Sequence, residues 1–83
     1  MSSRARARRV EELAVLILNM AARDYFNGVG RVLVPDLEAE GFSYDEIVEA
    51  LSKLRGEGYA VSVVGDVIKV YFEARGGGRA PSQ

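Results

Sequence analysis

The segment from Pro35 to Phe72 constrains the fold of this chain more than any other part of the sequence. Within it, Ser43 is followed three residues later by Glu46, a capping box that marks the start of a helix. Further on, Gly65 and Asp66 form a two-residue turn between runs rich in Val and Ile, which predicts a β-hairpin. The buried stripe of the predicted helix is Ile47, Ala50, Leu51 and Leu54. The segment therefore predicts a helix followed by a two-stranded ribbon.

The tight turn also predicts the register of this ribbon, because it pairs Val64 with Val67. One face then carries Tyr59, Val61, Val63, Ile68, Val70 and Phe72, and we expect this face to point into the core. The other face carries Ser62, Lys69 and Tyr71.

Further elements are predicted on the N-terminal side of this helix. A first helix is expected over Arg8–Arg23, where apolar residues recur at three- and four-residue spacing: Val10, Leu13, Ile17, Met20 and Ala21. The turn out of it covers 27–30, and Arg31–Val34 is short enough to be a third, edge strand. Pro35 suits the first turn of a second helix over Asp36–Glu40, which Gly41 ends.

The first helix is apolar nearly all round, because Val15, Leu16, Leu18 and Ala22 lie off its core stripe. Such a helix must be buried on more than one side. We therefore expect a homodimer through this helix, with Val15, Leu18 and Ala22 at the interface. The alternative is that Tyr25–Phe26 folds back over this face within one chain.

Composition narrows the classes of function. The 83 residues allow one small domain, and they contain no Cys, His or Trp, so we expect no metal, no cofactor, no catalytic residues and no enzyme activity. The apolar run from Leu13 to Leu18 is far shorter than the roughly 20 residues that span a bilayer, so we expect a cytoplasmic protein without membrane insertion. The predicted organisation is a basic flexible arm (1–7), one domain (8–74) and a Gly-rich disordered tail (75–83).

Charge is unevenly distributed although the net charge is only −1. The arm and the first helical turn carry Arg4, Arg6, Arg8 and Arg9 without an acid among them, a pattern suited to phosphate contacts. The region of the second and third helices carries acids without a base from Asp36 to Glu49, and its acids include Asp36, Glu38, Glu40, Asp45 and Glu49. This pattern indicates a basic arm on an acidic body.

The order of helix, short strand, helix, turn, helix and hairpin resembles the winged helix-turn-helix superfamily, as does the string EAEGFSYDEIVEALSKLRGEGYAVSVVGDVIKVYF. The string is similar to archaeal transcription regulators and to the C-terminal winged helices of minichromosome maintenance helicases and of the small subunit of replication protein A. Over about Val10 to Phe72, the resemblance implies an α+β fold with three helices, a C-terminal hairpin wing and a possible short third strand. Ser43 and Tyr44 match the start of the family's recognition helix, and Gly65–Asp66 matches the wing tip.

The resemblance implies a transcription regulator that binds double-stranded DNA, and the apolar first helix predicts that it is a small dimer. Its expected DNA-binding residues lie on the arm, the third helix and the hairpin: Arg4, Arg6, Arg8, Arg9, Ser43, Tyr44, Lys53, Arg55 and Lys69. The acids of the third helix oppose this interpretation, because they would meet phosphates. The alternative is an adaptor in a replication, transcription or membrane-remodelling complex, in which Asp36, Glu38, Glu40, Asp45 and Glu49 face a basic protein partner.

Overall fold

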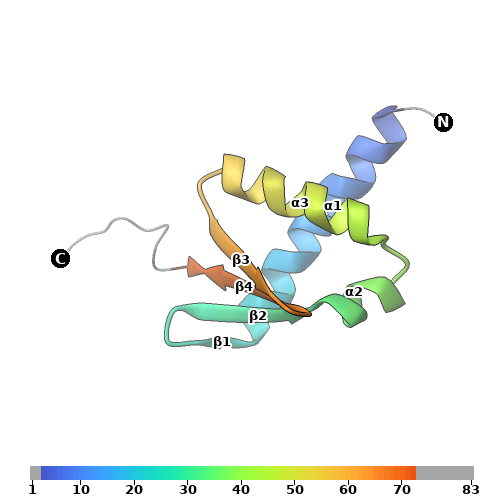
Figure 1. Ribbon diagram of the computed structural model, residues 1–83. Helices are drawn as coiled ribbons and strands as arrows, with labels where there is room; N and C mark the ends of the chain where they lie inside the picture. Colours follow the sequence, from blue (N-terminus) through green and yellow to red (C-terminus); the bar gives the residue numbers. More distant parts are fainter. Residues whose placement is uncertain (1–2, 73–83) are drawn as a thin grey trace.

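A computed structural model describes residues 3–72 of the chain as three helices and one four-stranded antiparallel sheet, which confirms the α+β class. The elements are α1 (Ser3–Arg23), β1 (Tyr25–Phe26), β2 (Val29–Leu33), α2 (Val34–Ala39), α3 (Tyr44–Gly56), β3 (Ala60–Val64) and β4 (Val67–Tyr71). The strand order is β1-β2-β4-β3, and Figure 1 shows α1 passing behind the sheet. This arrangement is compatible with a winged helix-turn-helix.

The local signals of the third helix and the hairpin are confirmed. The Ser43 hydroxyl accepts the backbone N–H of Glu46, and the Glu46 side chain accepts the backbone N–H of Ser43, so the capping box is complete. In the hairpin, Val64 pairs with Val67 and Val61 with Val70, as the turn predicts. The predicted core face differs at Val63, which is 37% exposed near the hairpin turn, whereas Val61 of the same strand is buried.

The first helix begins earlier than predicted, at Ser3 instead of Arg8. The part of the predicted flexible arm that the structure describes, residues 3–7, is therefore helical, and Arg4 and Arg6 lie on α1. Ala and Arg have high helix propensity, and contacts of Arg6 and Arg9 with α3 hold this end of the helix. The predicted tail over 75–83 lies outside the described residues.

A hairpin that the sequence interpretation missed follows α1. Asn27 and Gly28 both have positive φ, at 55° and 80°, and they connect β1 to β2. A two-residue Asn-Gly turn of this kind is typical of a tight hairpin. As a result β2 lies between β1 and β4. The strand predicted over Arg31–Val34 is therefore present as part of β2, but its predicted position at the edge of the sheet is wrong. The second helix begins at Val34, two residues before its predicted start.

Within residues 3–72, the helices cover one face of the sheet and leave the other face without a helix. Buried side chains of this inner face, among them Val32, Ile68 and Val70, pack with Leu13 and Ile17 of α1 and Leu54 of α3 in the core. Strand alternation directs Arg31, Lys69 and Tyr71 to the outer face.

The α1 helix approaches the sheet closely at Gly30. A Cβ atom at this position would lie 2.2 Å from the carbonyl oxygen of Ala21, in the last turns of α1. Only a residue without a side chain fits, so Gly30 sets how closely α1 packs on β2.

Candidate interaction surface

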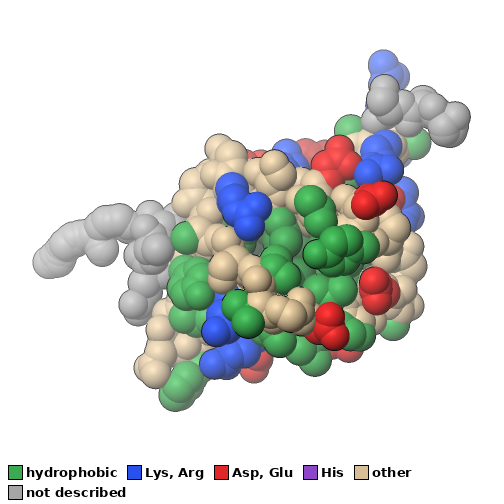
Figure 2. Space-filling model, in the orientation of Figure 1, with side chains coloured by type: hydrophobic (Ala, Val, Ile, Leu, Met, Phe, Trp, Pro, Cys, Tyr) green, Lys and Arg blue, Asp and Glu red, His purple; other side chains and the backbone are tan. Residues whose placement is uncertain are grey.

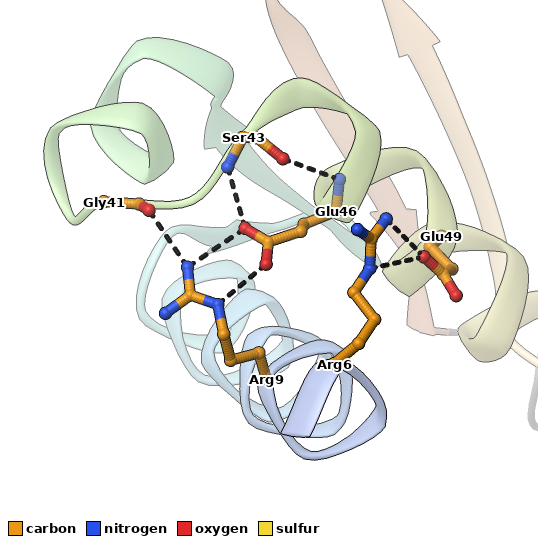
Figure 3. Close-up of polar contacts among 6 residues, drawn as sticks. All are labelled: Arg6, Arg9, Gly41, Ser43, Glu46 and Glu49. Carbon is orange, nitrogen blue, oxygen red and sulfur yellow. Dashed lines mark hydrogen bonds and ion pairs between the residues drawn. The ribbon is translucent and has the colours of Figure 1, made fainter. Parts of the chain in front are cut away.

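Two of the arginines predicted to bind phosphate instead bind carboxylates of α3. The Arg6 guanidinium donates to Glu49 at 2.7 Å and 3.0 Å, and the Arg9 guanidinium donates to both carboxylate oxygens of Glu46 at 2.7 Å and 3.0 Å. Figure 3 shows both pairs bridging α1 and α3. Arg9 also donates to the carbonyl oxygen of Gly41 at 3.0 Å. The two arginines thus fasten α1 to the start of α3.

This network changes the acid–base properties of its central carboxylate. The hydrogen bond from Arg9, with the bond from the Ser43 backbone N–H, lowers the pKa of Glu46 from 4.5 to about 2. In turn, the hydrogen bond to Glu46 and its charge raise the pKa of Arg9. Arg9 also lies over the Phe42 ring, with its guanidinium carbon 4.9 Å from the ring centroid.

Other predicted DNA-binding residues on α3 are also engaged within the chain. Ser43 caps the helix, Lys53 forms an ion pair with Glu57 at 3.2 Å, and the Arg55 side chain donates to the carbonyl oxygen of Val61 at 3.4 Å. Among the basic residues of this prediction, Arg4 and Arg8 are exposed and have no ion pair within residues 3–72.

The exposed face of α3 is apolar and acidic instead of basic. Tyr44 and Val48, one turn apart, are 54% and 47% exposed, and we call these two side chains the α3 apolar patch. Asp45 and Glu49 are the exposed residues that follow each of them in the sequence. In Figure 2, hydrophobic side chains occupy the middle of the face on which α3 lies, with Asp and Glu side chains along one side. An exposed apolar patch with a polar border is typical of a protein-binding surface.

The sequence interpretation placed Tyr44 on this face but missed Val48. The sequence does contain a signal for the exposure of Val48. It is an apolar residue that lies off the core stripe of Ile47, Leu51 and Leu54.

The hairpin turn is not a free wing tip. The backbone N–H of Val34 donates to the carbonyl oxygen of Asp66 at 2.8 Å, so the hairpin turn is held against the start of α2, as Figure 1 shows. Lys69 lies on the outer face of the sheet, away from the helices. The structure therefore does not bring Lys69 together with Tyr44 in one surface.

The residues expected at a dimer interface lie on the outer side of α1. Val15 is 54% exposed, Leu18 is half-buried and packs partly against the core, and Ala22 is exposed. The alternative expectation for this face is wrong, because Tyr25–Phe26 forms β1 beside β2 and both of its residues are exposed.

The acids expected to face a basic partner are all exposed: Asp36, Glu38, Glu40, Asp45 and Glu49. Glu49 is the one among them that forms an ion pair within residues 3–72, with Arg6. The acidic surface that remains lies on α2 and the first turn of α3.

A groove of about 270 Å³ lies where the end of α1 meets β2 and α2. Arg23 and Arg31 line it together with Asp24 and Asp36, so charges of both signs border it in equal number. Within residues 3–72, no group of three His, Cys, Asp or Glu side chains is placed to hold a metal ion. Over the same residues, no helix has the length and apolar character needed to cross a membrane.

Comparisons of this chain with models of known protein families, with curated proteins and with solved structures gave no match. The likeness to the winged helix-turn-helix superfamily therefore rests on the sequence pattern and on the order of the elements.

Proposed function

We propose that this chain is a winged-helix protein-interaction module that binds a basic, partly apolar segment of a partner protein on the exposed face of α3. The observation that carries the proposal is the α3 apolar patch, Tyr44 and Val48, beside exposed acids. In a protein that reads the major groove, this face would carry Arg, Lys, Asn or Gln. Acids at these positions repel phosphates and attract Lys and Arg.

A selection from a random peptide library displayed on phage tests this proposal. We expect wild-type protein to enrich peptides that combine large apolar residues with Lys or Arg. Val48→Ser should weaken the binding of a selected peptide about tenfold, because the few residues that dominate an interface cluster near its centre and each contribute more than about 1 kcal/mol. The measurement is fluorescence anisotropy with the labelled peptide.

Val15→Ser is the matched control, because Val15 on α1 has a similar exposed fraction, 54% against 47% for Val48. This variant should bind the peptide as wild type does. Failure to enrich any such peptide, or equal losses in the two variants, would contradict the proposal.

Duplex DNA is the second candidate partner, favoured by the exposed Arg4 and Arg8. The two lie four residues apart on the same side of α1 and have no ion pair within residues 3–72. Titration of a random-sequence duplex at 50 mM and 200 mM salt tests it, since two phosphate contacts predict a slope of about −2 in log affinity against log salt. The Arg4→Ala/Arg8→Ala variant should abolish that slope.

A further inference from the structure

The outer edge of β3 carries backbone groups that no neighbouring strand binds. β3 is the last strand in the order β1-β2-β4-β3, so one side pairs with β4 and the other side has no strand among residues 3–72. The hydrogen bonds of β4 with its two neighbours determine which residues of β3 direct their backbone N–H and C=O groups to the outer edge.

The register of β4 with its two neighbours determines this pattern. The N–H of Phe72 donates to the carbonyl of Gly28, and the carbonyl of Asp66 accepts the N–H of Val34, so even-numbered residues of β4 bond toward β2. Odd-numbered residues of β4 therefore bond toward β3, where they meet Ala60, Ser62 and Val64. The N–H and C=O groups of Val61 and Val63 are left pointing away from the sheet.

Two contacts agree with this assignment. Tyr59, which has the same parity, donates its N–H outward to the carbonyl of Leu54. The carbonyl of Val61 accepts a hydrogen bond from the Arg55 side chain at 3.4 Å, a long bond at the limit for this type of contact. Toward the hairpin turn, the groups of Val63 have no hydrogen bond among the described residues.

Arg55 also shows that α3 and this edge belong to one surface. Because its side chain reaches Val61, this side of α3 borders β3. Val48 and Tyr44 lie two and three turns earlier on the same side of the helix, so the α3 apolar patch lies on the side of α3 that faces this edge. Figure 1 shows α3 and β3 diverging from their short connection.

The edge lacks the features by which proteins prevent strand pairing. Residues 60–64 read Ala-Val-Ser-Val-Val, with no charge and no proline, and they pair with β4 without a bulge. Edge strands usually carry Lys, Pro or a bulge when they are to remain unpaired. Two exposed acids flank this surface, Asp45 beside Tyr44 in the first turn of α3 and Asp66 in the hairpin turn that follows β3.

We infer that the partner segment binds as an added β-strand on the outer edge of β3, and that it is an extended apolar peptide carrying Lys or Arg. Its backbone bonds Val61 and Val63, replacing the weak contact of Arg55. Its alternate side chains on the helix side contact Val48 and Tyr44, and its basic residues face the nearby acids. This inference rests on the proposed function and specifies how the partner is held.

Amide hydrogen exchange on the ¹⁵N-labelled full chain tests the inference, with a peptide selected on the wild-type protein as the probe. In the free protein, the amides of Val61 and Val63 should exchange much faster than those of Ser62 and Val64. Saturating peptide should slow the exchange of the Val61 and Val63 amides at least tenfold.

Unchanged exchange while the peptide remains bound would overturn the inference and leave the proposed function standing. Failure of any peptide to bind would contradict the proposed function itself. Protection that appears without peptide and grows with protein concentration would also overturn it, since a second copy would then occupy the edge.

Two substitutions at Val63 distinguish the contribution of its backbone N–H to peptide binding from that of its side chain. Val63→Pro removes the outward N–H without removing a bond to β4, and edge strands tolerate Pro at such positions. We expect Val63→Pro to bind the peptide about tenfold more weakly than Val63→Ala, with circular dichroism confirming that both fold. Equal affinity of the two folded variants would overturn the inference.

Discussion

At the scale of single residues, Glu46 has two roles. It completes the capping box of α3, and it forms an ion pair with Arg9 of α1. Its carboxylate accepts hydrogen bonds from Arg9 and from the backbone N–H of Ser43. Glu46 is buried, with 7% of its surface exposed. The residue thus connects a local sequence signal to the packing of α1 on α3.

This position predicts a pH-dependent stability. Folding lowers the pKa of Glu46 from 4.5 to about 2, so the ionised carboxylate stabilises the fold fully above about pH 4.5 and loses this effect as the pH falls toward 2. Glu46→Gln should therefore lower the melting temperature at pH 7, and the difference from wild type should shrink steadily between pH 4.5 and 2. Thermal unfolding followed by circular dichroism measures it.

Glu38→Gln serves as the control, because Glu38 is exposed on α2 and forms no ion pair within the described residues. A melting-temperature difference for Glu46→Gln that stays constant from pH 7 to 2 would contradict the role given to its charge.

At the scale of elements, the contact of α1 with β2 depends on Gly30. Gly30→Ala places a Cβ atom against the backbone of Ala21, which has no flexible side chain that can move away. We expect a loss of about 1–3 kcal/mol in the free energy of unfolding, as for other overpacked contacts. Urea denaturation measures this loss.

Gly56→Ala is the matched substitution, because a Cβ at Gly56 would meet no atom within 4 Å. At this helical position Ala should leave stability unchanged or raise it slightly. If both variants lost the same stability, the close approach at Gly30 would not be the cause.

Elements with local signals were predictable, and those that depend on distant contacts were not. The cap at Ser43, the helix after it and the Val64–Val67 register each follow from a few neighbouring residues. The Asn27–Gly28 hairpin had such a signal, yet its first strand is only two residues long and β2 carries Gly30, so the alternating pattern was weak. The early start of α1 is supported by the contacts of Arg6 and Arg9 with α3, which are distant in the sequence.

The candidate site was harder to predict because it depends on which charges neutralise one another. Arg6 and Arg9 are three residues apart, as are Glu46 and Glu49, so antiparallel packing of α1 on α3 matches both pairs. That match is visible only when the two helices are known to be adjacent. Without it, the sequence predicts a free basic arm and an acidic body.

At the scale of the whole molecule, this pairing removes two positive charges from the surface that a nucleic acid would meet. The net charge of −1 conceals this effect, since it counts paired and free arginines alike. Whether the chain attracts a duplex therefore depends on the contacts of Arg6 and Arg9 more than on the total charge.

Releasing these arginines should create a binding property that the native chain suppresses. In the Glu46→Gln/Glu49→Gln variant both guanidiniums lose their carboxylate partners, while Gln at position 46 still completes the capping box. We expect tighter binding to a random-sequence duplex, and a salt slope steeper than that of wild type by about 2, roughly 0.9 for each added phosphate contact. The Glu38→Gln/Glu40→Gln variant changes the net charge by the same amount at two exposed acids without ion pairs within residues 3–72, so it should gain little. Equal gains in the two variants would mean that overall charge, and not the release of Arg6 and Arg9, controls the affinity for DNA.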